Sequence, residues 1–225
     1  MTKLAMPLCM STNAGYVDTA GFLALQGLFT AHVTGNFVTL GASLVFGSAG
    51  AVAKLLALPV FCAVIVMTRL AAHTLSRLGL PILRTMLTAQ CVLLALAALL
   101  AHELAPGQRG DDWPAVLTGM VLVAAMAIQN AASRIHLASA PPTTLMTGTT
   151  TQIMIDIADL IRGMAAEDRA AAKTRLSKMV PNVLAFAIGC GAGALIFSRF
   201  GMWCFVIPPI LAATPVLMDT SASRA

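Results

Sequence analysis

The chain has 225 residues, of which 58% are hydrophobic and 10% are charged, and its formal net charge is +5. Soluble domains usually carry about 25% charged residues, because their surfaces face water. The few charges lie in short runs between long apolar stretches and form no basic face, which excludes a nucleic-acid partner from our expectations. The composition therefore predicts an all-α integral membrane protein.

The first apolar stretch extends from residue 3 to residue 54, which is too long for one membrane-spanning helix of about 20 residues. We divide it at the segment 31–36, where polar residues interrupt the apolar pattern. This division predicts a first span over 7–29 and a short apolar segment over 37–46. A second span is predicted over 51–72.

Four further stretches contain no formal charge and predict spans three to six, centred near Leu94, Val123, Ile188 and Pro209. The connection 139–178 between spans four and five is the only sizeable polar one. Its residues 150–164 have the pattern of an amphipathic helix, suited to the inner leaflet or to the side of the bundle. The alternative is that this segment is the cytoplasmic start of the fifth span, kinked near Pro181.

The two faces of this amphipathic helix can be assigned from its helical period. The apolar face is predicted to hold Ile153, Ile157, Leu160, Ile161 and Met164. The polar face is predicted to hold Gln152, Asp156, Asp159 and Arg162.

Lysine and arginine side chains divide unequally between the two sides of this topology. Eleven fall on the side of both chain ends and three on the other, which accounts for all 14. Cationic loops remain in the cytoplasm because their translocation is disfavoured. We therefore expect both termini to be cytoplasmic.

The two halves of the chain resemble each other. Thr34-Gly35 follows the first span, and Thr147-Gly148 follows the fourth, 113 residues later. In each half a span leads to a Thr-Gly turn, then to a short broken or amphipathic helix, and then to two more spans. Because three is an odd number, the second unit must be inserted upside-down relative to the first. The sequence predicts two inverted three-helix repeats, 1–110 and 111–225, an architecture of secondary transporters.

Four short motifs resemble a known family, the YoaK-like bacterial membrane proteins. The motifs are Gly15-Tyr16-Val17-Asp18, His32-Val33-Thr34-Gly35-Asn36, Gln129-Asn130 and Met146-Thr147-Gly148-Thr149. This resemblance covers essentially the whole chain. It implies a six-helix protein of the bacterial inner membrane and suggests small-molecule transport, but it supplies no substrate and no catalytic residues.

Asp18 lies near the middle of the first predicted span. A carboxylate at that depth costs at least about 2.5–3.5 kcal/mol, so it should face a partner or a wet cavity. The functional interpretation is a proton, cation or solute site. The structural interpretation is that Asp18 pairs with Arg134 or Arg69, or caps a break in the helix.

Other polar groups at membrane depth have two interpretations as well. Gln129 and Asn130 can bind solute or simply join helices. The Thr-Gly turns present backbone amides that suit an anion, while threonine and Asn36 can instead cap the following helices. The candidate solute- or ion-binding residues are therefore Asp18, Thr34, Gly35, Asn36, Gln129, Asn130, Thr147, Gly148 and Thr149.

Glycine, cysteine and histidine patterns favour structural roles over chemistry. Gly189 and Gly193 form a GxxxG face, which predicts close helix packing. The five cysteines lie in apolar segments without CxxC spacing, and the four histidines lie near span ends without metal-binding spacing. We expect no metal site and no cofactor.

The leading functional hypothesis is a carrier or channel for a small polar solute, with a site near the membrane midplane around Asp18 and possible proton coupling. The alternative is a membrane scaffold or sensor that uses the helix 150–164 to bind a cytoplasmic partner. An enzyme is not expected, because HExxH, GxSxG and paired carboxylates at membrane depth do not occur in the sequence. A homodimer is compatible with the GxxxG face.

Overall fold

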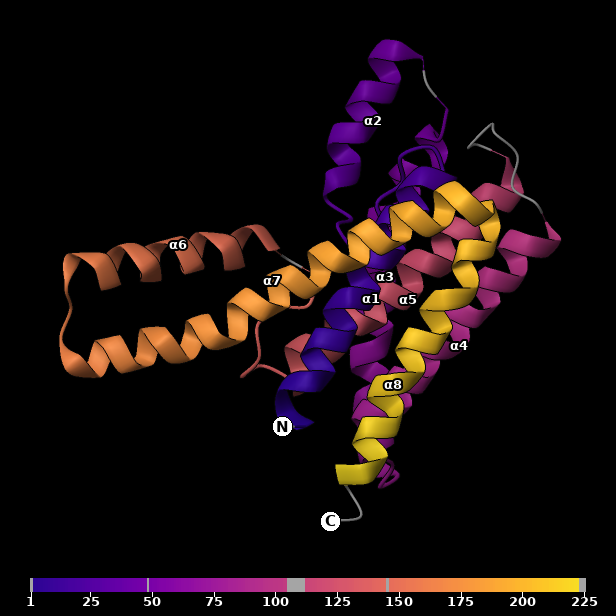
Figure 1. Cartoon of the computed structure of the whole chain (residues 1–225). Coiled ribbons are helices and arrows are strands. Elements are labelled where there is room, and N and C mark those ends of the chain that lie inside the picture. The colour runs from indigo at the N-terminus through magenta and orange to yellow at the C-terminus, as the bar shows by residue number, and fades with distance from the viewer. Residues whose placement is uncertain (1, 48, 105–111, 145, 223–225) are drawn as a thin grey trace.

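The computed structural model of the chain describes residues 2–47, 49–104, 112–144 and 146–222. The regular elements in these ranges are all helices (Figure 1). They are α1 (Thr2–Ala24), α2 (Gly35–Phe46), α3 (Ala51–Arg77), α4 (Ile82–Glu103), α5 (Trp113–His136), α6 (Met146–Arg162), α7 (Ala166–Phe200), the 3₁₀ helix η1 (Gly201–Val206) and α8 (Ile207–Ala222). The predicted all-α fold is confirmed.

Four helical stretches in the described residues are long and apolar enough to cross a membrane. They are Ala51–Arg77, Ile82–Glu103, Trp113–His136 and the continuous stretch Ala166–Asp219, which joins α7, η1 and α8. Large apolar side chains on these helices remain exposed, among them Leu55, Val92, Ile188 and Ile210. Such surfaces are unfavourable in water and suit contact with lipid, as expected of a helical membrane protein.

The predicted first span is corrected at its end. α1 stops at Ala24 rather than at residue 29, because Gln26 and Gly27 have left-handed φ angles of 54° and 83°. The amide of Gly27 instead bonds to the carbonyl oxygen of Phe22 at 2.9 Å. α1 is also absent from the four membrane-capable stretches, since polar residues such as Asn13 and Asp18 lower its hydropathy.

α1 and α5 are the helices that bring the bundle together. α1 packs against α7 and α8, and α5 packs against α3 and α4, while α4 and α8 also contact each other. At the far end of α7 the chain reverses through η1, so that α8 runs back beside α1 and α4 (Figure 1). The phenol of Tyr16 on α1 donates to the carbonyl oxygen of Cys204 in η1 at 2.9 Å, which anchors this reversal.

The crossing of α1 and α7 depends on glycine. A Cβ atom added at Gly15 would overlap the carbonyl oxygen of Phe186, and one added at Gly189 would overlap that of Thr12. At Gly193 it would lie 2.7 Å from the carbonyl oxygen of Tyr16. The two backbones therefore touch directly, and the close packing predicted from the GxxxG face is confirmed.

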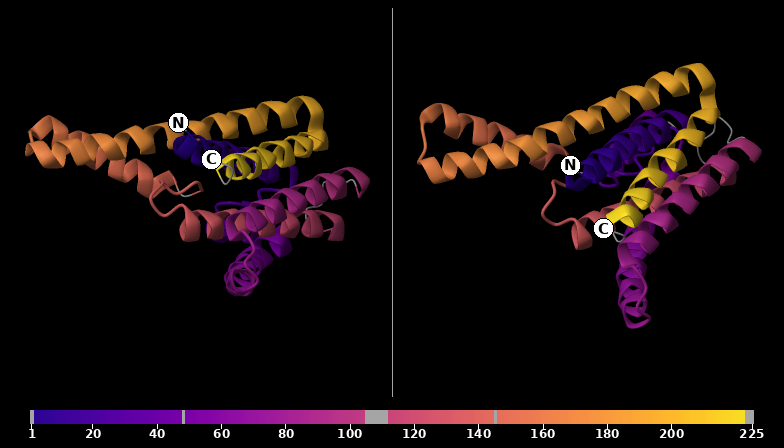
Figure 2. Two further views of the ribbon diagram at one scale, coloured as in Figure 1. Left: turned by 90° about the horizontal axis from the view of Figure 1, so that it is seen from below. Right: turned by 60° about the horizontal axis from the view of Figure 1, so that its bottom comes forward.

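α6 and the first part of α7 form a hairpin that stands out from the bundle (Figures 1 and 2). α7 has 35 residues and is about 52 Å long, which exceeds a hydrocarbon core of about 30 Å. It is a continuous helix from Ala166 through Pro181. Residues 166–178 are therefore the start of the fifth predicted span, whereas most of the predicted amphipathic segment 150–164 forms a separate helix, α6, folded back along it.

The predicted faces of α6 are partly wrong. Asp156, assigned to the outer polar face, is 1% exposed and lies against α7 together with Ile153. Ile161, assigned to the apolar face, is 81% exposed, so this end of the face does not pack against the bundle. Arg175 of α7 decides this orientation, because its guanidinium contacts both carboxylate oxygens of Asp156, at 2.7 and 3.1 Å.

Asp156→Asn should loosen this hairpin, whereas Asp159→Asn, on an exposed position of the same helix, should not. The side-chain hydrogen bond from Arg175 holds the pKa of Asp156 below its ordinary value. The stabilisation is therefore fully present above the ordinary aspartate pKa and is lost as the pH falls through the lower, folded-state value. Limited proteolysis of the hairpin should become several-fold faster in Asp156→Asn alone. Equal rates in both variants would contradict this assignment.

α2 confirms the predicted short apolar segment and begins two residues earlier, at Gly35. Its twelve residues span about 18 Å, roughly half of the hydrocarbon core. Phe37, Val45 and Phe46 are each at least 60% exposed. Like α6, this helix extends away from the bundle (Figure 1).

Candidate functional site

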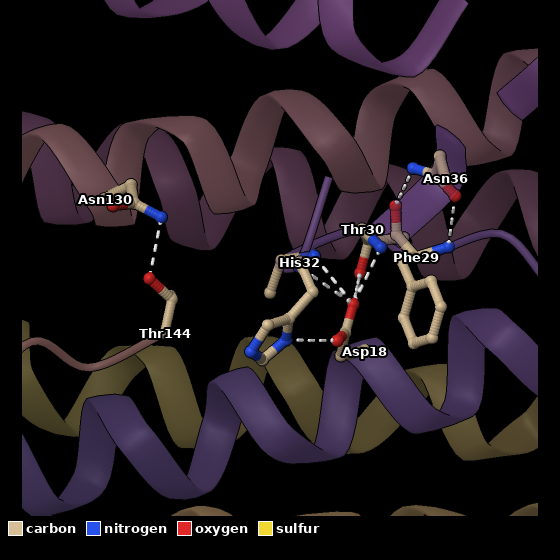
Figure 3. Close-up of polar contacts among 8 residues, drawn as sticks. Asp18, Phe29, Thr30, His32, Asn36, Asn130 and Thr144 are labelled. Atoms are coloured by element: carbon tan, nitrogen blue, oxygen red, sulfur yellow. Dashed lines mark hydrogen bonds and ion pairs between the residues drawn. The ribbon is translucent and has the colours of Figure 1, made fainter. Parts of the chain in front are cut away.

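The loop that follows α1 folds back onto Asp18, which is 4% exposed (Figure 3). Its Oδ1 atom accepts hydrogen bonds from the amides of Thr30 and Ala31, both at 2.7 Å. Buried amides with no such acceptor would each cost about 1–3 kcal/mol. The carboxylate therefore fixes the polar turn that the sequence placed at 31–36.

The second carboxylate oxygen of Asp18 has a different contact. Oδ2 lies 2.8 Å from Nδ1 of His32, whose side chain is 29% exposed. The His32 ring packs edge-on against Phe186 of α7, with ring centroids 5.4 Å apart. One oxygen thus holds the backbone, and the other holds a titratable ring that reaches the solvent.

The structure decides between the structural interpretations of Asp18. Among the described residues Asp18 pairs with His32, not with Arg134 or Arg69. The interpretation as a cap on the helix break agrees with the two amide bonds. The sequence did not indicate His32 as the partner of Asp18, because His32 lies near the end of a predicted span, 14 residues away.

Asn36 is buried at 2% exposure, and both atoms of its amide group are engaged. Its Oδ1 accepts from the amide of Phe29 at 2.9 Å, and its Nδ2 donates to the carbonyl oxygen of Phe29 at 2.7 Å (Figure 3). Thr34 makes no capping hydrogen bond to α2. The idea that these two residues cap α2 is therefore wrong, and Asn36 instead closes the loop 29–36.

The loop after α5 is held in a related way. Asn130 donates to the hydroxyl of Thr144 at 2.7 Å, and these two residues are 14 positions apart. Asp18 and His32 are also 14 positions apart. Both members of the second pair lie 112 residues after those of the first (130 − 18 and 144 − 32). Each half thus ties the turn after a long helix to a side chain of that helix, with a carboxylate and an imidazole in the first half and an amide and a hydroxyl in the second.

Gln129 lies deeper in the bundle and is 0% exposed. Its amide nitrogen donates to the carbonyl oxygen of Met10 at 2.9 Å and to the hydroxyl of Thr143 at 3.2 Å. Its carbonyl oxygen accepts from Gln90 at 2.6 Å. These bonds join α1, α4, α5 and the loop before α6, which agrees with its interpretation as a residue that joins helices.

Three neighbouring cavities lie along these two loops. The first, of about 430 Å³, is lined by Asp18, Thr34 and Gly35, and His32 borders it as well. The central cavity, of about 440 Å³, is lined by Thr147, Gly148 and Thr149 and also by His32. The third, of about 210 Å³, is lined by Asn130. His32 is shared by the first and central cavities, and Arg134 by the central and third.

Seven of the nine candidate residues therefore line these cavities. Asn36 and Gln129 line none of the three. Both halves of the chain line this row of cavities. α1, its loop and α7 line the first cavity, α6 and α7 contribute to the central one, and α5 with the connection to α6 lines the third. Gly35 allows close packing within the first loop, since a Cβ there would lie 3.0 Å from the Phe29 ring. Gly148 borders open space, since a Cβ there would meet nothing within 4 Å.

In the described residues, four helical stretches long and apolar enough to cross a membrane define a multi-pass helical membrane protein as the class of this chain. The DUF1275 family, described as a protein of unknown function, matches residues 6–218. This match covers nearly the whole chain, and the chain belongs to that family. Comparison with curated proteins and with solved structures gives no match.

Proposed function

We propose that the chain is a carrier or channel that passes a small polar solute across the bacterial inner membrane without changing it chemically. The observation that supports this most is the row of cavities whose linings share His32 and Arg134. Ligand sites for small molecules are commonly cavities of about 300–1,000 Å³, and transporters place them between their structural repeats. Asp18 lies at one end of this row.

The packing of the helices supports two inverted repeats, 1–110 and 111–225. In such a repeat α1 corresponds to α5, α2 to α6, α3 to α7 and α4 to α8. Each main contact between two helices then has a counterpart between the two corresponding helices. The contact of α1 with α7 becomes that of α5 with α3, and α4 with α5 becomes α8 with α1. α2 on α3 likewise becomes α6 on α7. An axis in the membrane plane would relate the halves.

The same arrangement suggests six crossings, by α1, α3, α4, α5, α7 and α8. The start of α1 and the end of α8 lie at the same end of the bundle (Figures 1 and 2). Eleven of the 14 basic residues belong to that side of the predicted topology. We place this end in the cytoplasm, because basic loops are retained there.

The pair of Asp18 and His32 supports proton coupling. Imidazole is the side chain that gains and loses a proton most readily near neutral pH. At His32 this change would occur between the first and the central cavity, 2.8 Å from a buried carboxylate. A solute and a proton would then meet at the same ring.

Uptake into proteoliposomes tests this function. The purified chain should take up at least one member of a panel made of phosphate, acetate, glycerol and choline, and an imposed proton gradient should drive its accumulation. His32→Gln should abolish this accumulation, while His73→Gln, at an exposed position on α3, should not. Equal accumulation by the unchanged chain and both variants would show that His32 takes no part in transport.

A scaffold or sensor is the second candidate function. It is favoured by the hairpin of α6 and α7, which stands out from the bundle and exposes Met154 and Ile161 at 56% and 81%. A non-transporting scaffold would lose its cytoplasmic partner when the hairpin is deleted, and its intact chain would take up no solute. Under the carrier hypothesis the same deletion removes one wall of the central cavity and should stop uptake.

A further inference from the structure

We propose that the solute is a small anion, a carboxylate or an oxyanion such as phosphate, and that it binds in the central cavity between Arg134, His32 and the first turn of α6. This inference rests on the proposed function only in calling the bound molecule a solute. The binding site itself is argued from the chemistry of the cavity.

Nine residues line the central cavity, and none of them is acidic. Its basic side chains are those of Arg134 and His32. Two of these residues can carry positive charge, and the others are neutral. At about 440 Å³ the cavity has the size of a small-molecule site rather than of a single water.

Arg134 supplies the permanent charge of the site. It lies in the last turn of α5, and in the part of the chain that the structure describes it forms no ion pair with an acidic residue. The two described ion pairs use His32 with Asp18 and Arg175 with Asp156. A guanidinium group suits planar carboxylates and phosphates because its N–H groups bind two oxygens at once.

The backbone of α6 adds neutral donors on the opposite wall. α6 begins at Met146, so the first-turn amides that include those of Thr147 and Gly148 lack acceptors within the helix. The positive end of the helix dipole favours an anion at this place. Since a Cβ at Gly148 would meet nothing within 4 Å, an anion can approach this backbone closely.

His32 completes the site and connects it to Asp18. Asp18 lies behind the ring and lines the first cavity but not the central one. The carboxylate is therefore kept from the anion, while the imidazole borders it. A proton on His32 and an anion in the cavity would stabilise each other, which is the chemistry that proton-coupled anion uptake requires.

The test is the melting temperature of the purified full chain in nonionic detergent at constant ionic strength. Sodium phosphate or sodium acetate, replacing sodium chloride, should raise the melting temperature in a saturable way, because a ligand of the folded state stabilises it by mass action. Glycerol and tetramethylammonium chloride should not. Arg134→Gln should weaken the anion effect at least about tenfold, since charged hydrogen bonds are lost. Arg162→Gln, at an exposed position outside the cavity, is the control.

A second variant guards against misfolding of Arg134→Gln. Gly148→Ala places one methyl group in open space inside a helix, so the ligand-free protein should melt at the same or a slightly higher temperature. Its anion effect should nevertheless decrease several-fold, because the methyl group separates the anion from the backbone amides. Unchanged anion binding in both variants would overturn the proposed site.

The remaining outcomes separate this inference from the proposed function. Stabilisation by glycerol or tetramethylammonium instead of the anions would overturn the anion site and leave the carrier intact. Stabilisation by phosphatidylglycerol in mixed micelles, but not by dissolved phosphate or acetate, would identify a lipid headgroup and overturn the site as well. Anion binding that depends on Arg134 without any uptake into proteoliposomes would support the site and contradict the carrier.

Discussion

Gly189→Val should prevent the chain from reaching its folded state in the membrane, whereas Gly191→Val should have little effect. The first substitution places a side chain against the carbonyl oxygen of Thr12 and the amide of Tyr16, both backbone atoms of α1. At Gly191, two residues further along α7, a Cβ would meet nothing within 4 Å. The two variants carry the same chemical change in the same helix.

The destabilisation expected for Gly189→Val is large because the backbone of α1 would have to shift to make room for the new side chain. Overpacking usually costs about 1–3 kcal/mol and more where the obstacle cannot rotate away. Here the obstacle is the backbone of a helix that also carries Asp18. This loss is large against a total stability of about 5–15 kcal/mol. It should appear as aggregation in size-exclusion chromatography or as a strongly lowered melting temperature in thermal unfolding. Two variants with equal melting temperatures would contradict the direct contact of α1 and α7.

Asp18→Asn should abolish proton-driven uptake while leaving the chain folded. Asparagine keeps one carbonyl oxygen, which can still accept from the amides of Thr30 and Ala31. It removes the negative charge beside Nδ1 of His32. A decrease of at least about tenfold is expected, because a hydrogen bond to a charged group contributes about 1.5–3 kcal/mol. Uptake by Glu103→Gln, which removes an exposed carboxylate at the end of α4, should remain normal.

Asp18→Ala separates the two functions of the carboxylate. It removes the acceptor for Thr30 and Ala31 as well as the charge, so it should lower the melting temperature where Asp18→Asn does not. If both variants lose uptake only in proportion to the amount of folded protein, Asp18 stabilises the loop and takes no part in transport.

The spans and the helix breaks could be predicted because they depend on local patterns. Long apolar stretches mark α3, α4, α5, α7 and α8 wherever they later pack. The turn after α1 is marked by polar residues, and the close crossing of α1 and α7 by Gly189 and Gly193. In each case the residues that show the pattern in the sequence are the ones that form the helix, the turn or the crossing.

The partner of Asp18 could not be predicted, because it depends on the path of a loop. His32 reaches Asp18 only because Gln26 and Gly27 turn the chain back through left-handed conformations. A glutamine residue rarely has a positive φ angle, so the sequence gives no sign of this turn. The nearest usable signal is that Asn130 and Thr144 repeat the spacing of 14 residues.

The orientation of α6 shows the limit of helical periodicity. Asp156 lies at the edge of the predicted polar face, next to the apolar face. The helical pattern therefore leaves open whether Asp156 faces outward or packs against another helix. The choice is made by Arg175, 19 residues later on another helix, which gives the carboxylate two hydrogen bonds. A pattern within one helix holds no information about such a partner.

A carrier or channel must open its row of cavities to both sides of the membrane, and cysteine accessibility tests this requirement most directly. On a background in which the five native cysteines are replaced, single cysteines are placed at Thr34 and at Gly148. Each is then treated with an impermeant thiol reagent, from the outside in intact cells and from the inside in inverted vesicles. We predict that both positions react from both sides, and that a saturating bound solute slows the reaction. Reaction of either cysteine from one side only, unaffected by solute, would contradict a carrier or channel and favour the scaffold.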